Sequence, residues 1–480
     1  MTADNSFKVS RARRGPATDP VSRALTADAG AAQAFVRIHG DRLLYDHTNG
    51  AWLEFDGVRW VKDEFGRIAQ HGLAVSQELL IDASQMLLRA ARERDPIEQR
   101  HRKEEAERLL VAAQSLHKKV RLDAMIDLAA TDPKIAARRS MFDAEDMILG
   151  VQNGVMDLSS SQTLHRPGAS RDFIALQAGC AFVPTAQCPT WISFLERVQP
   201  DQEVRTWLQR LVGYWLTGRT AEQSFTVFHG FGANGKTVFT ETIRKLMGSY
   251  AVSADFGTFT AKDKGSDAIR NDIARLDKKR LVVASEGPEG ARLDEDLIKR
   301  ITGGEELTAR FLHREFFSFK PKFKLVLVTN HRPGIYGTDL GIWRRVVLVP
   351  WSITVPLEEQ DRRLSDRLEA ELPGILRWAL QGLTEYLEKG LSPLPARIAA
   401  ANSEYQRDSD IVGLWIEDCC VLDRALRTAN GKLLNSYSSW AHSSGHRIMS
   451  MKSLGDRLRE KGLTQWRSGS VRGWAGISCT

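Results

Sequence analysis

Four short apolar runs mark the centre of the chain. They cover residues 225–228, 281–284, 325–328 and 346–349. Uninterrupted runs of this length, rich in branched side chains, are typical of strands that are buried on both faces of a parallel sheet. The pattern therefore predicts an α/β core in which helices cover both faces of a parallel sheet.

Before this core, apolar residues recur at helical spacing across residues 73–128, with dense charge between them. The pair Asp95-Pro96 interrupts the pattern and starts a second helix, because aspartate caps a helix and proline suits its first turn. We interpret the intervening charges as a solvated face. The leucines expected on the apolar faces are Leu79, Leu80, Leu87, Leu88, Leu109, Leu110 and Leu116.

Short β-like pieces lie on either side of these helices, at residues 35–60 and 148–166. Asp56-Gly57 in the first stretch and Asn153-Gly154 in the second indicate hairpins. Residues 191–218 are again helical in pattern. The sequence thus predicts a mixed α+β N-terminal domain at 34–200, preceded by a basic, disordered arm at 1–33.

The C-terminal part shows a different pattern. A helical stretch at 357–390 closes the core domain, predicted at 201–396, and a proline-rich boundary follows at 392–395. Three short helices and a hairpin are then expected at 412–420, 433–443, 453–461 and 464–474. This order suggests a winged helix at 408–480. Its candidate phosphate contacts are Lys452, Arg457, Arg459, Arg467 and Arg472, and we interpret Trp466 and Trp474 as packing of the wing. The alternative is a protein-interaction module.

The first apolar run leads into the sequence GFGANGKT at residues 230–237, which fits G-x-x-x-x-G-K-[ST]. Such a loop directs backbone amides at one point, and a helix N-terminus adds to this anion site. We expect Lys236 to reach the β- and γ-phosphates of ATP, and Thr237 to join the Mg²⁺ shell. The alternative is a glycine-rich turn without a ligand. The candidate nucleotide-binding residues are Gly230, Gly232, Ala233, Asn234, Gly235, Lys236, Thr237 and Val238.

Polar residues flank the other three runs. Glu286 and Asn330 follow the second and third runs, and Arg344-Arg345 precedes the fourth. Ligands of open α/β sheets gather at the carboxyl ends of the strands. Glu286 could hold Mg²⁺ and act as the base for the attacking water, while Asn330 could bind that water or the γ-phosphate. Either arginine could serve a neighbouring subunit as an arginine finger. Taken singly, a surface acid and a helix cap are the simpler interpretations.

Residues 310–324 hold five Lys or Arg and one Glu, interleaved with five Phe. Basic side chains beside aromatic rings suit single-stranded nucleic acid. Arg310 belongs to this stretch, and His313 and Arg314 would lie at a hairpin turn. The alternative is a β-ribbon whose phenylalanines are core and whose charges are solvated.

Composition adds limits to this picture. The 480 residues carry a formal net charge of +7, which permits a polyanionic partner without requiring one. No apolar run approaches the roughly 18–20 residues of a membrane span, so we expect a cytoplasmic protein without a membrane partner. Five cysteines without a C-x-x-C pair favour reduced thiols, and Cys419, Cys420, His442 and His446 are only a faint zinc pattern.

The order of GFGANGKT, RLVVASEGPEG, TGGEELTARFLHREFFSFKPKFK, LVLVTN and GTDLGIWRR resembles the superfamily 3 helicases, and most closely the phage/plasmid primase-helicase family related to the poxvirus primase-helicase. The resemblance extends upstream through LGVQNGVMDL and covers roughly residues 35–480. It implies an AAA+-like P-loop NTPase core. Gly235, Lys236 and Thr237 would bind phosphates, and Glu286 would be the Walker B acid. Asn330 would be the sensor 1 residue, Arg345 the arginine finger with Arg344 as second choice, and His313 and Arg314 the tip of a DNA-gripping hairpin.

The resemblance further implies an ATP-dependent hexameric DNA helicase of a mobile element's replication system. This helicase would move 3′ to 5′ on a single strand. Family members often carry a primase-polymerase domain before this region, and 33 residues are too few for one. We therefore expect a separate primase or polymerase as partner. The alternatives are an ATP-gated replication initiator or regulator that separates no strands, and a partner-loading or packaging motor.

Overall fold

The structure is a computed structural model that describes residues 28–479, apart from 161–163, 262–270, 288, 313–314, 338–339 and 447. It divides into two compact units. One comprises the residues up to 144 together with 168–175, and the other comprises 145–167 and the residues from 176 onward. Most of the arm predicted at 1–33 lies outside the described residues, but 28–33 belong to a helix, which corrects the predicted boundary.

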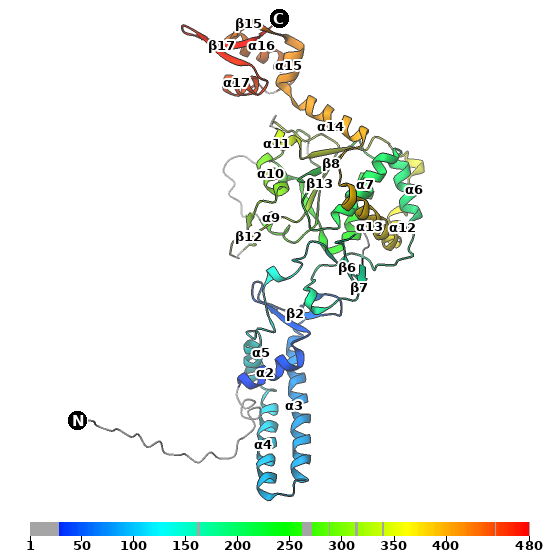
Figure 1. The fold of residues 1–480 in the computed structure, drawn as a ribbon, viewed down its shortest axis with the longest axis vertical. Helices are drawn as coiled ribbons and strands as arrows, with labels where there is room; N and C mark the ends of the chain where they lie inside the picture. Colours follow the sequence, from blue (N-terminus) through cyan, green and yellow to red (C-terminus); the bar gives the residue numbers. More distant parts are fainter. Residues whose placement is uncertain are drawn as a thin grey trace, which may run out of the picture. The chain divides into compact units, whose positions relative to one another are not determined.

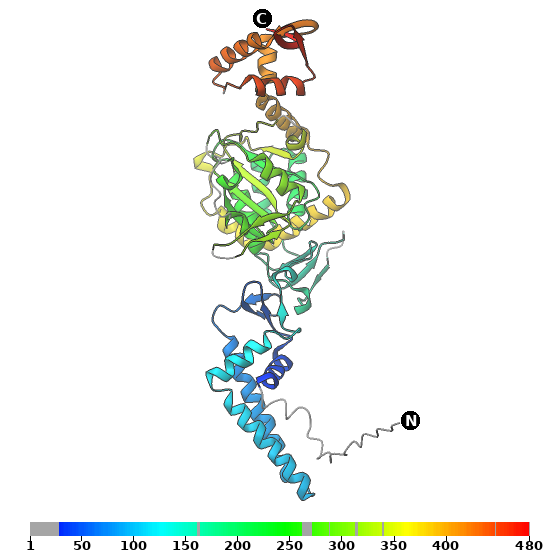
Figure 2. The ribbon, with the colours of Figure 1, turned by 90° about the vertical axis from the view of Figure 1, so that its left-hand side faces the viewer.

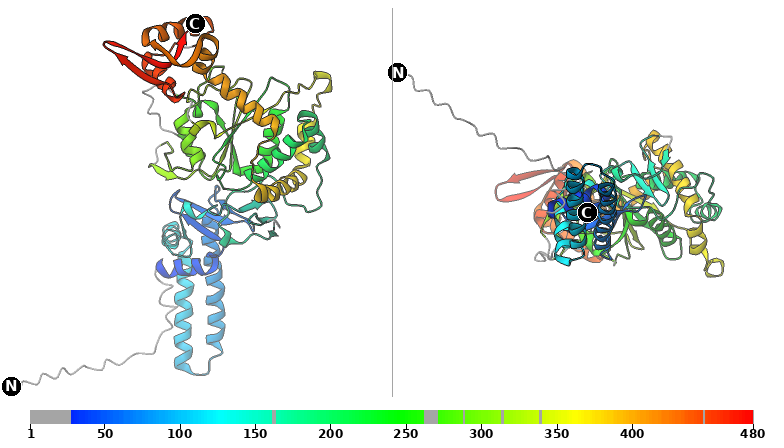
Figure 3. Two further views of the ribbon diagram at one scale, coloured as in Figure 1. Left: turned by 45° about the horizontal axis from the view of Figure 1, so that its top comes forward. Right: turned by 90° about the horizontal axis from the view of Figure 1, so that it is seen from below.

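The first unit combines a four-stranded sheet with a long helical hairpin, in which α3 and α4 lie side by side (Figures 1 and 3). The sheet has the strand order β3-β2-β1-β4. Its elements are α2 (Asp28–His39), β1 (Leu43–Asp46), β2 (Ala51–Phe55), β3 (Trp60–Lys62), α3 (Ile68–Ala91), α4 (Pro96–Ser115), α5 (Lys119–Ala129) and β4 (Ala136–Ala137).

Local sequence explains two of these elements, whereas the structure corrects the prediction for a third. The predicted hairpin joins β2 and β3, and the Asp56 carboxylate accepts the amides of Val58 and Arg59 in its turn. The predicted cap of α4 is also confirmed, since Asp95 accepts from the Ile97 amide and Pro96 opens the helix. Residues 35–39, however, are helical rather than β-like, because an alanine-rich face of α2 buries against α3 and α5.

The second unit begins with a small antiparallel sheet and two helices. Its first strands form the hairpin predicted at Asn153-Gly154, with Gly154 at φ 148°. These elements are β5 (Ile148–Val151), β6 (Gly154–Asp157), β7 (Leu164–Arg166), α6 (Pro189–Val198) and α7 (Gln202–Trp215).

A five-stranded parallel sheet forms the centre of the second unit, with the order β14-β8-β13-β10-β9. All four predicted runs are strands of this sheet. The elements are β8 (Phe225–His229), α8 (Lys236–Met247), β9 (Ala251–Asp255), α9 (Asn271–Ala274), β10 (Leu281–Ser285), α10 (Glu295–Gly303), β11 (Leu307–Ala309), β12 (Phe317–Phe319), β13 (Lys324–Thr329), α11 (Leu340–Trp343), β14 (Val346–Pro350), α12 (Leu364–Ala370) and α13 (Leu372–Lys389).

Alternate residues of these strands face two separate cores. Phe228 and Val283 pack with α6, α7, α8 and α13, whereas Val227 and Val282 pack with α9 and α10. Burial of each such side chain stabilises the fold by roughly 1.5–3 kcal/mol relative to leaving it exposed to water. Helices therefore cover both faces of the sheet, as the sequence predicts (Figures 1 and 2).

Two basic side chains close the amino-terminal edge of the sheet. Lys324 is fully buried, and its ammonium donates to the carbonyls of Thr217 and Arg219 just after α7. Arg280, directly before β10, donates to the carbonyls of Leu216 and Ile148. Leu216 is the C-cap of α7, and Thr217 and Arg219 follow it, so the two cations hold the chain where it leaves this helix.

The C-terminal module follows α14 and has its own core around Trp415, Tyr437 and Trp474. The predicted helices and hairpin are present, and the structure adds β15, which pairs with β17 in a sheet of order β15-β17-β16. Figure 3 shows α14 leading from the sheet to this module. The elements are α14 (Ala396–Ser409), α15 (Ile411–Cys419), β15 (Cys420–Ala429), α16 (Asn430–Ser443), α17 (Met451–Glu460), β16 (Thr464–Ser468) and β17 (Val471–Cys479).

Candidate functional site

The conformation of the loop between β8 and α8 is fixed by close backbone packing. The buried Asn234 amide donates to the carbonyls of Trp351, at 2.9 Å, and Phe231. A Cβ on Gly230 would lie 2.0 Å from the Trp351 oxygen, and one on Gly235 would lie 2.8 Å from Val198. Gly235 also has φ 84° at the start of α8. These two positions therefore require glycine.

Lys236, the first residue of α8, is buried beside this loop. Its ammonium donates to the Gly230 carbonyl, to Asn234 Oδ1 at 3.1 Å and to Asn330 Oδ1 at 3.2 Å. Burial lowers the pKa of Lys236 to about 8. Because all three of these acceptors are neutral oxygens, an anion in the site would give the ammonium a charged partner.

A cavity of about 300 Å³ brings the predicted residues together. Residues 232–238 line it with Ser285, Glu286 and 328–330. The Glu286 amide donates to the Val328 carbonyl at 3.1 Å, which extends the pairing of β10 with β13, and the chain leaves the strand at Glu286, where φ is 64°. Thr237 in α8 and Glu286 and Asn330 directly after β10 and β13 share this cavity. Gly230 supports the loop without lining the cavity.

The two candidate arginine fingers differ from each other. Arg345 is 8% exposed, and its guanidinium donates to Thr302 Oγ1 at 3.0 Å and to the Gly341 carbonyl at 2.6 Å. It joins α10, α11 and β14 within its own chain, and it does not line the cavity. Arg344 is exposed. Of the two candidates, only Arg344 is therefore accessible to a neighbouring subunit without rearrangement, because consecutive residues at a strand start point to opposite sides.

A second cavity of about 590 Å³ lies on the other side of the loop and shares Ala233, Gly235 and Val238 with the first. Sequence analysis missed it, because its lining comes from distant segments without a motif. Apolar side chains of α6 and of residues 355–364 form much of its wall, together with Arg197 and Arg367. Arg197 pairs with Glu359, and Arg367 pairs with Asp361.

The basic and aromatic stretch is a hairpin of β11 and β12, with Leu307 opposite Phe319. Its predicted tip residues, His313 and Arg314, lie outside the described residues. Arg310 lies over the ring of Phe316, 4.6 Å from the centroid, and Phe316 is 62% exposed.

Other members of the stretch are structural, which corrects the view of it as one basic surface. Phe319 and Phe323 belong to the core. Lys322 pairs with Asp146 at 2.6 Å, and Lys324 is buried at the end of α7. The cation count of a segment does not reveal such partners, because a lysine stem is long enough to carry its ammonium to another element.

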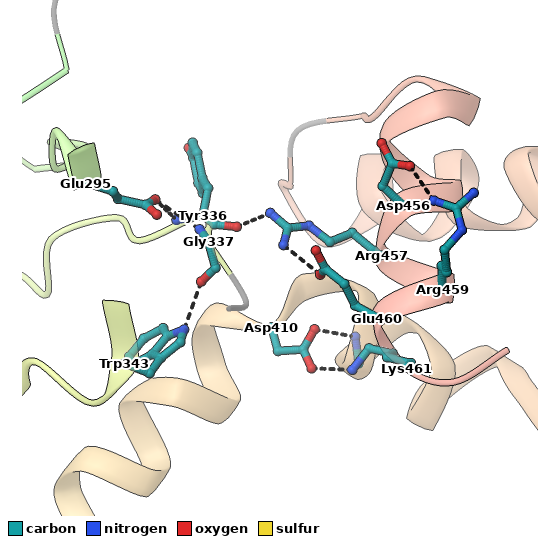
Figure 4. A network of polar contacts seen from close by, with 11 residues as sticks. Glu295, Tyr336, Gly337, Trp343, Asp410, Asp456, Arg457, Arg459, Glu460 and Lys461 are labelled. Atoms are coloured by element: carbon teal, nitrogen blue, oxygen red, sulfur yellow. Dashed lines mark hydrogen bonds and ion pairs between the residues drawn. The ribbon is translucent and has the colours of Figure 1, made fainter. Parts of the chain in front are cut away.

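The candidate phosphate contacts of the C-terminal module also separate into two groups. Lys452 is exposed, and the exposed Arg467 and Arg472 lie directly opposite each other on β16 and β17. Arg457 is instead half-buried and donates to the Tyr336 carbonyl of the core and to Glu460 (Figure 4).

Comparison with known proteins assigns the chain to a family. The model of a domain described as "D5 N terminal like" matches residues 32–200. The Acanthamoeba polyphaga mimivirus protein "Putative helicase L207/L206" is 25% identical over 401 residues, or 78% of this chain. The African swine fever virus protein "Putative primase C962R" is 22% identical over 209 residues, or 42% of this chain. This chain is a D5-like protein of the primase-helicase family.

A second family model, described as "Family of unknown function (DUF5906)", matches residues 228–345 of this D5-like protein. That range contains every residue that lines the smaller cavity. Frog virus 3 has a further relative, "Putative helicase 022R", which is 26% identical over 246 residues, or 47% of the chain.

The D5-like chain covers only part of these relatives: 41% of the mimivirus protein, 25% of the frog virus protein and 22% of the swine fever virus protein. Among solved structures, the apo A form of the NrS-1 C-terminal region has a TM-score of 0.41 and 11% identity, over 62% of this chain and 77% of that one.

Two further observations concern the described residues alone. Their helices include none with the length and apolar character that a bilayer crossing requires. Their His, Cys, Asp and Glu side chains form no cluster of three or more that could hold a metal ion.

Proposed function

We propose that this D5-like protein is an ATP-dependent DNA helicase that serves the replication of a phage, plasmid or other mobile element. The observation that carries the proposal is the cavity of about 300 Å³ shared by Lys236, Thr237, Glu286 and Asn330. An ammonium, a hydroxyl, a carboxylate and an amide beside a helix N-terminus are the groups that transfer of a phosphoryl group to water uses. The viral relatives named as helicases support DNA unwinding as the work that is done.

The chemistry of the cavity fits a nucleoside triphosphate. The backbone amides at the start of α8 and the Lys236 ammonium would bind its phosphates. The second cavity is continuous with the loop through Ala233, Gly235 and Val238, and its apolar wall would take the base and sugar. On this proposal, the unit is a P-loop NTPase of the AAA+-like type.

Oxygen ligands for Mg²⁺ are present in the same cavity. Thr237 and Glu286 would hold the ion, which supplies positive charge beside the phosphates when bound. Glu286 would accept the proton of the attacking water, and the Asn330 amide would orient that water. Glu286 is exposed at the cavity, so water has access to its carboxylate.

Motion on DNA would use the β11–β12 hairpin within a hexameric ring. The exposed Phe316 ring can stack on a base, and Arg310 above it can reach a phosphate. His313 and Arg314 would complete this contact at the tip. Arg344 would act as the finger for the nucleotide of the neighbouring subunit. The 3′ to 5′ direction and the separate primase or polymerase partner rest on the family resemblance.

A second candidate function is an ATP-gated replication initiator that separates no strands. The observation in its favour is the pair of opposed arginines, Arg467 and Arg472, on the exposed hairpin of the C-terminal module. Like charges placed opposite each other destabilise a hairpin, and a DNA phosphate between them would relieve the repulsion. With three helices and a hairpin, the module would be a winged helix that binds duplex DNA.

A fork-unwinding assay with the purified full chain separates the two candidates. The helicase proposal predicts strand separation that requires both ATP and Mg²⁺. ATP hydrolysis with DNA binding, but without separation of any forked substrate, would contradict it and favour the initiator.

A further inference from the structure

The segment 330–337 connects the nucleotide cavity to the C-terminal part of the chain. At its start, Asn330 contacts Lys236. Two residues later, the Arg332 guanidinium donates to Glu404 and Asp408 of α14, each at 2.8 Å. The Tyr405 hydroxyl of α14 donates to the Pro333 carbonyl. The helix that leads to the C-terminal module is therefore tied to the residues that follow Asn330.

The end of this segment is a turn that is fixed to the core. The amides of Tyr336 and Gly337 both donate to Glu295 Oε1 at 2.9 Å, at the start of α10. Trp343 of α11 donates to the Gly337 carbonyl at 2.8 Å. The turn thus presents the Tyr336 carbonyl in a set position, as Figure 4 shows.

Arg457 of α17 reaches this carbonyl from the C-terminal module. Its neighbours behave differently: Arg459 pairs with Asp456, and Lys461 pairs with Asp410, both inside the module. Figure 4 shows these pairs beside the contact that Arg457 makes with the core. A cation on the candidate DNA-binding helix is therefore engaged by the core.

We propose that the bond between Arg457 and the Tyr336 carbonyl is a latch that DNA opens. A guanidinium binds phosphate through two charge-assisted hydrogen bonds, which are stronger than one bond to a neutral carbonyl. Both terminal nitrogens of this guanidinium are already engaged, one by Glu460 and the other by the Tyr336 carbonyl, so a two-bond contact of these nitrogens with a phosphate competes with the latch. This inference rests on the proposed function only in assuming that the module binds DNA.

The latch also links the two ligands of the protein. DNA that draws Arg457 away removes one of the bonds that hold the segment beginning at Asn330. A coupling of this kind acts in both directions. Nucleotide at Lys236 is thus expected to change the affinity of the module for DNA.

The test measures binding of the full chain to fluorescein-labelled duplex DNA by anisotropy, without nucleotide. Glu295→Ala loosens the turn and leaves α17 unchanged. If the latch is closed in about 80–90% of molecules, opening it tightens DNA binding about 5- to 10-fold. Asp296→Ala removes the same charge from the next, exposed residue of α10 and is expected to bind as the wild type does. Arg457→Ala is expected to bind more weakly than the wild type.

A second variant tests the latch independently, so that the test does not depend on correct folding of Glu295→Ala. The pair Tyr336→Cys and Glu460→Cys keeps Arg457, and a reductively cleavable bismaleimide that joins the two thiols locks α17 on the turn. Crosslinking is expected to weaken DNA binding, and reductive cleavage to restore it, whereas the wild type treated with the same reagent is unchanged. If Glu295→Ala binds no more tightly than Asp296→Ala, or the locked pair binds DNA as well as the cleaved pair, the latch is refuted.

These outcomes are distinct from failure of the proposed function. A chain that unwinds forks but shows equal DNA affinity in all variants lacks the latch alone. A chain that neither hydrolyses ATP nor unwinds DNA, yet tightens on DNA with Glu295→Ala, has the latch without the helicase activity. Absence of DNA binding in both the wild type and Glu295→Ala overturns the latch.

Discussion

The two edges of the central sheet each carry a buried lysine, and the two lysines differ in what surrounds them. Lys236 lies at the carboxyl edge, contacts the Asn330 side chain and faces a cavity. Lys324 lies at the amino edge, where its ammonium is enclosed by carbonyls that follow α7. Burial lowers the pKa of both side chains. On the proposed function, the buried cation that borders open space binds a ligand, whereas the enclosed cation stabilises the fold.

The comparison implies that changes at the carboxyl edge alter chemistry and changes at the amino edge alter stability. The largest effect is expected for Glu286→Gln, which keeps the shape of the cavity but removes the base. Hydrolysis of ATP should fall by about 10²- to 10⁴-fold, the usual contribution of a general base. Phosphate release measures the rate, and fluorescent nucleotide binding should stay within a few-fold of the wild type.

Glu289→Gln is the matched control for that variant, since Glu289 is an exposed acid in the same loop that does not line the cavity. Its rate should equal that of the wild type. Equal rates for Glu286→Gln and Glu289→Gln would remove Glu286 from the chemistry.

At the amino edge, Lys324→Ala should destabilise the protein without changing its chemistry. The buried Thr217 carbonyl loses its donor, and a cavity is left in place of the side chain, at a total cost of about 2–4 kcal/mol. The midpoint of thermal unfolding should fall by about 3–6 °C, because a unit of this size unfolds with an entropy of roughly 0.7 kcal/mol/K.

Lys320→Ala provides the comparison for Lys324, because Lys320 is exposed in the same basic stretch. Its effect should stay within about 0.5 kcal/mol. If Lys324→Ala unfolds at the wild-type temperature but loses affinity for single-stranded DNA, the buried lysine belongs to the DNA surface after all.

The smallest effect is a pH dependence of nucleotide affinity. Lys236 has a lowered pKa of about 8 in the free protein, and the charge of the phosphates raises this pKa on binding. Below pH 8 the lysine is protonated in both states, so affinity is constant. Above pH 8 binding must take up a proton, and affinity should fall by up to about tenfold per pH unit. Titrations at pH 7, 8 and 9 measure this slope.

Lys236→Arg tests the origin of the slope, because arginine stays protonated across this range. Its nucleotide affinity should show no fall between pH 8 and 9. The same slope in this variant would assign the pH dependence to another group.

The carboxyl edge could be predicted from the sequence for a physical reason. A polar residue directly after a buried parallel strand must lie at the carboxyl edge of the sheet. Glu286 and Asn330 are therefore expected close to the loop that follows β8. The order of the runs thus predicted the sheet and the cavity. The strand β9 escaped notice because its residues are only partly buried and carry no long apolar run.

The remaining features depend on distant partners that no local pattern reveals. Arg344 and Arg345 differ only in the side of the strand start to which they point, and Arg345 finds Thr302 on α10. Lys324 finds the end of α7, and Arg457 finds the Tyr336 turn. Each contact joins residues 43 or more positions apart. Charge patterns predict which side chains are cations, but tertiary packing decides which of them remain exposed.

The most direct test of the central claim is ATP hydrolysis by Lys236→Ala in the presence of forked DNA. Lys245→Ala is its control, because Lys245 lies on the same helix, pairs with Glu369 and does not line the cavity. The account predicts that the wild type and Lys245→Ala hydrolyse ATP, and that Lys236→Ala releases no phosphate above the background without protein. Hydrolysis by Lys236→Ala at the wild-type rate would contradict the assignment of the cavity as the site of ATP hydrolysis.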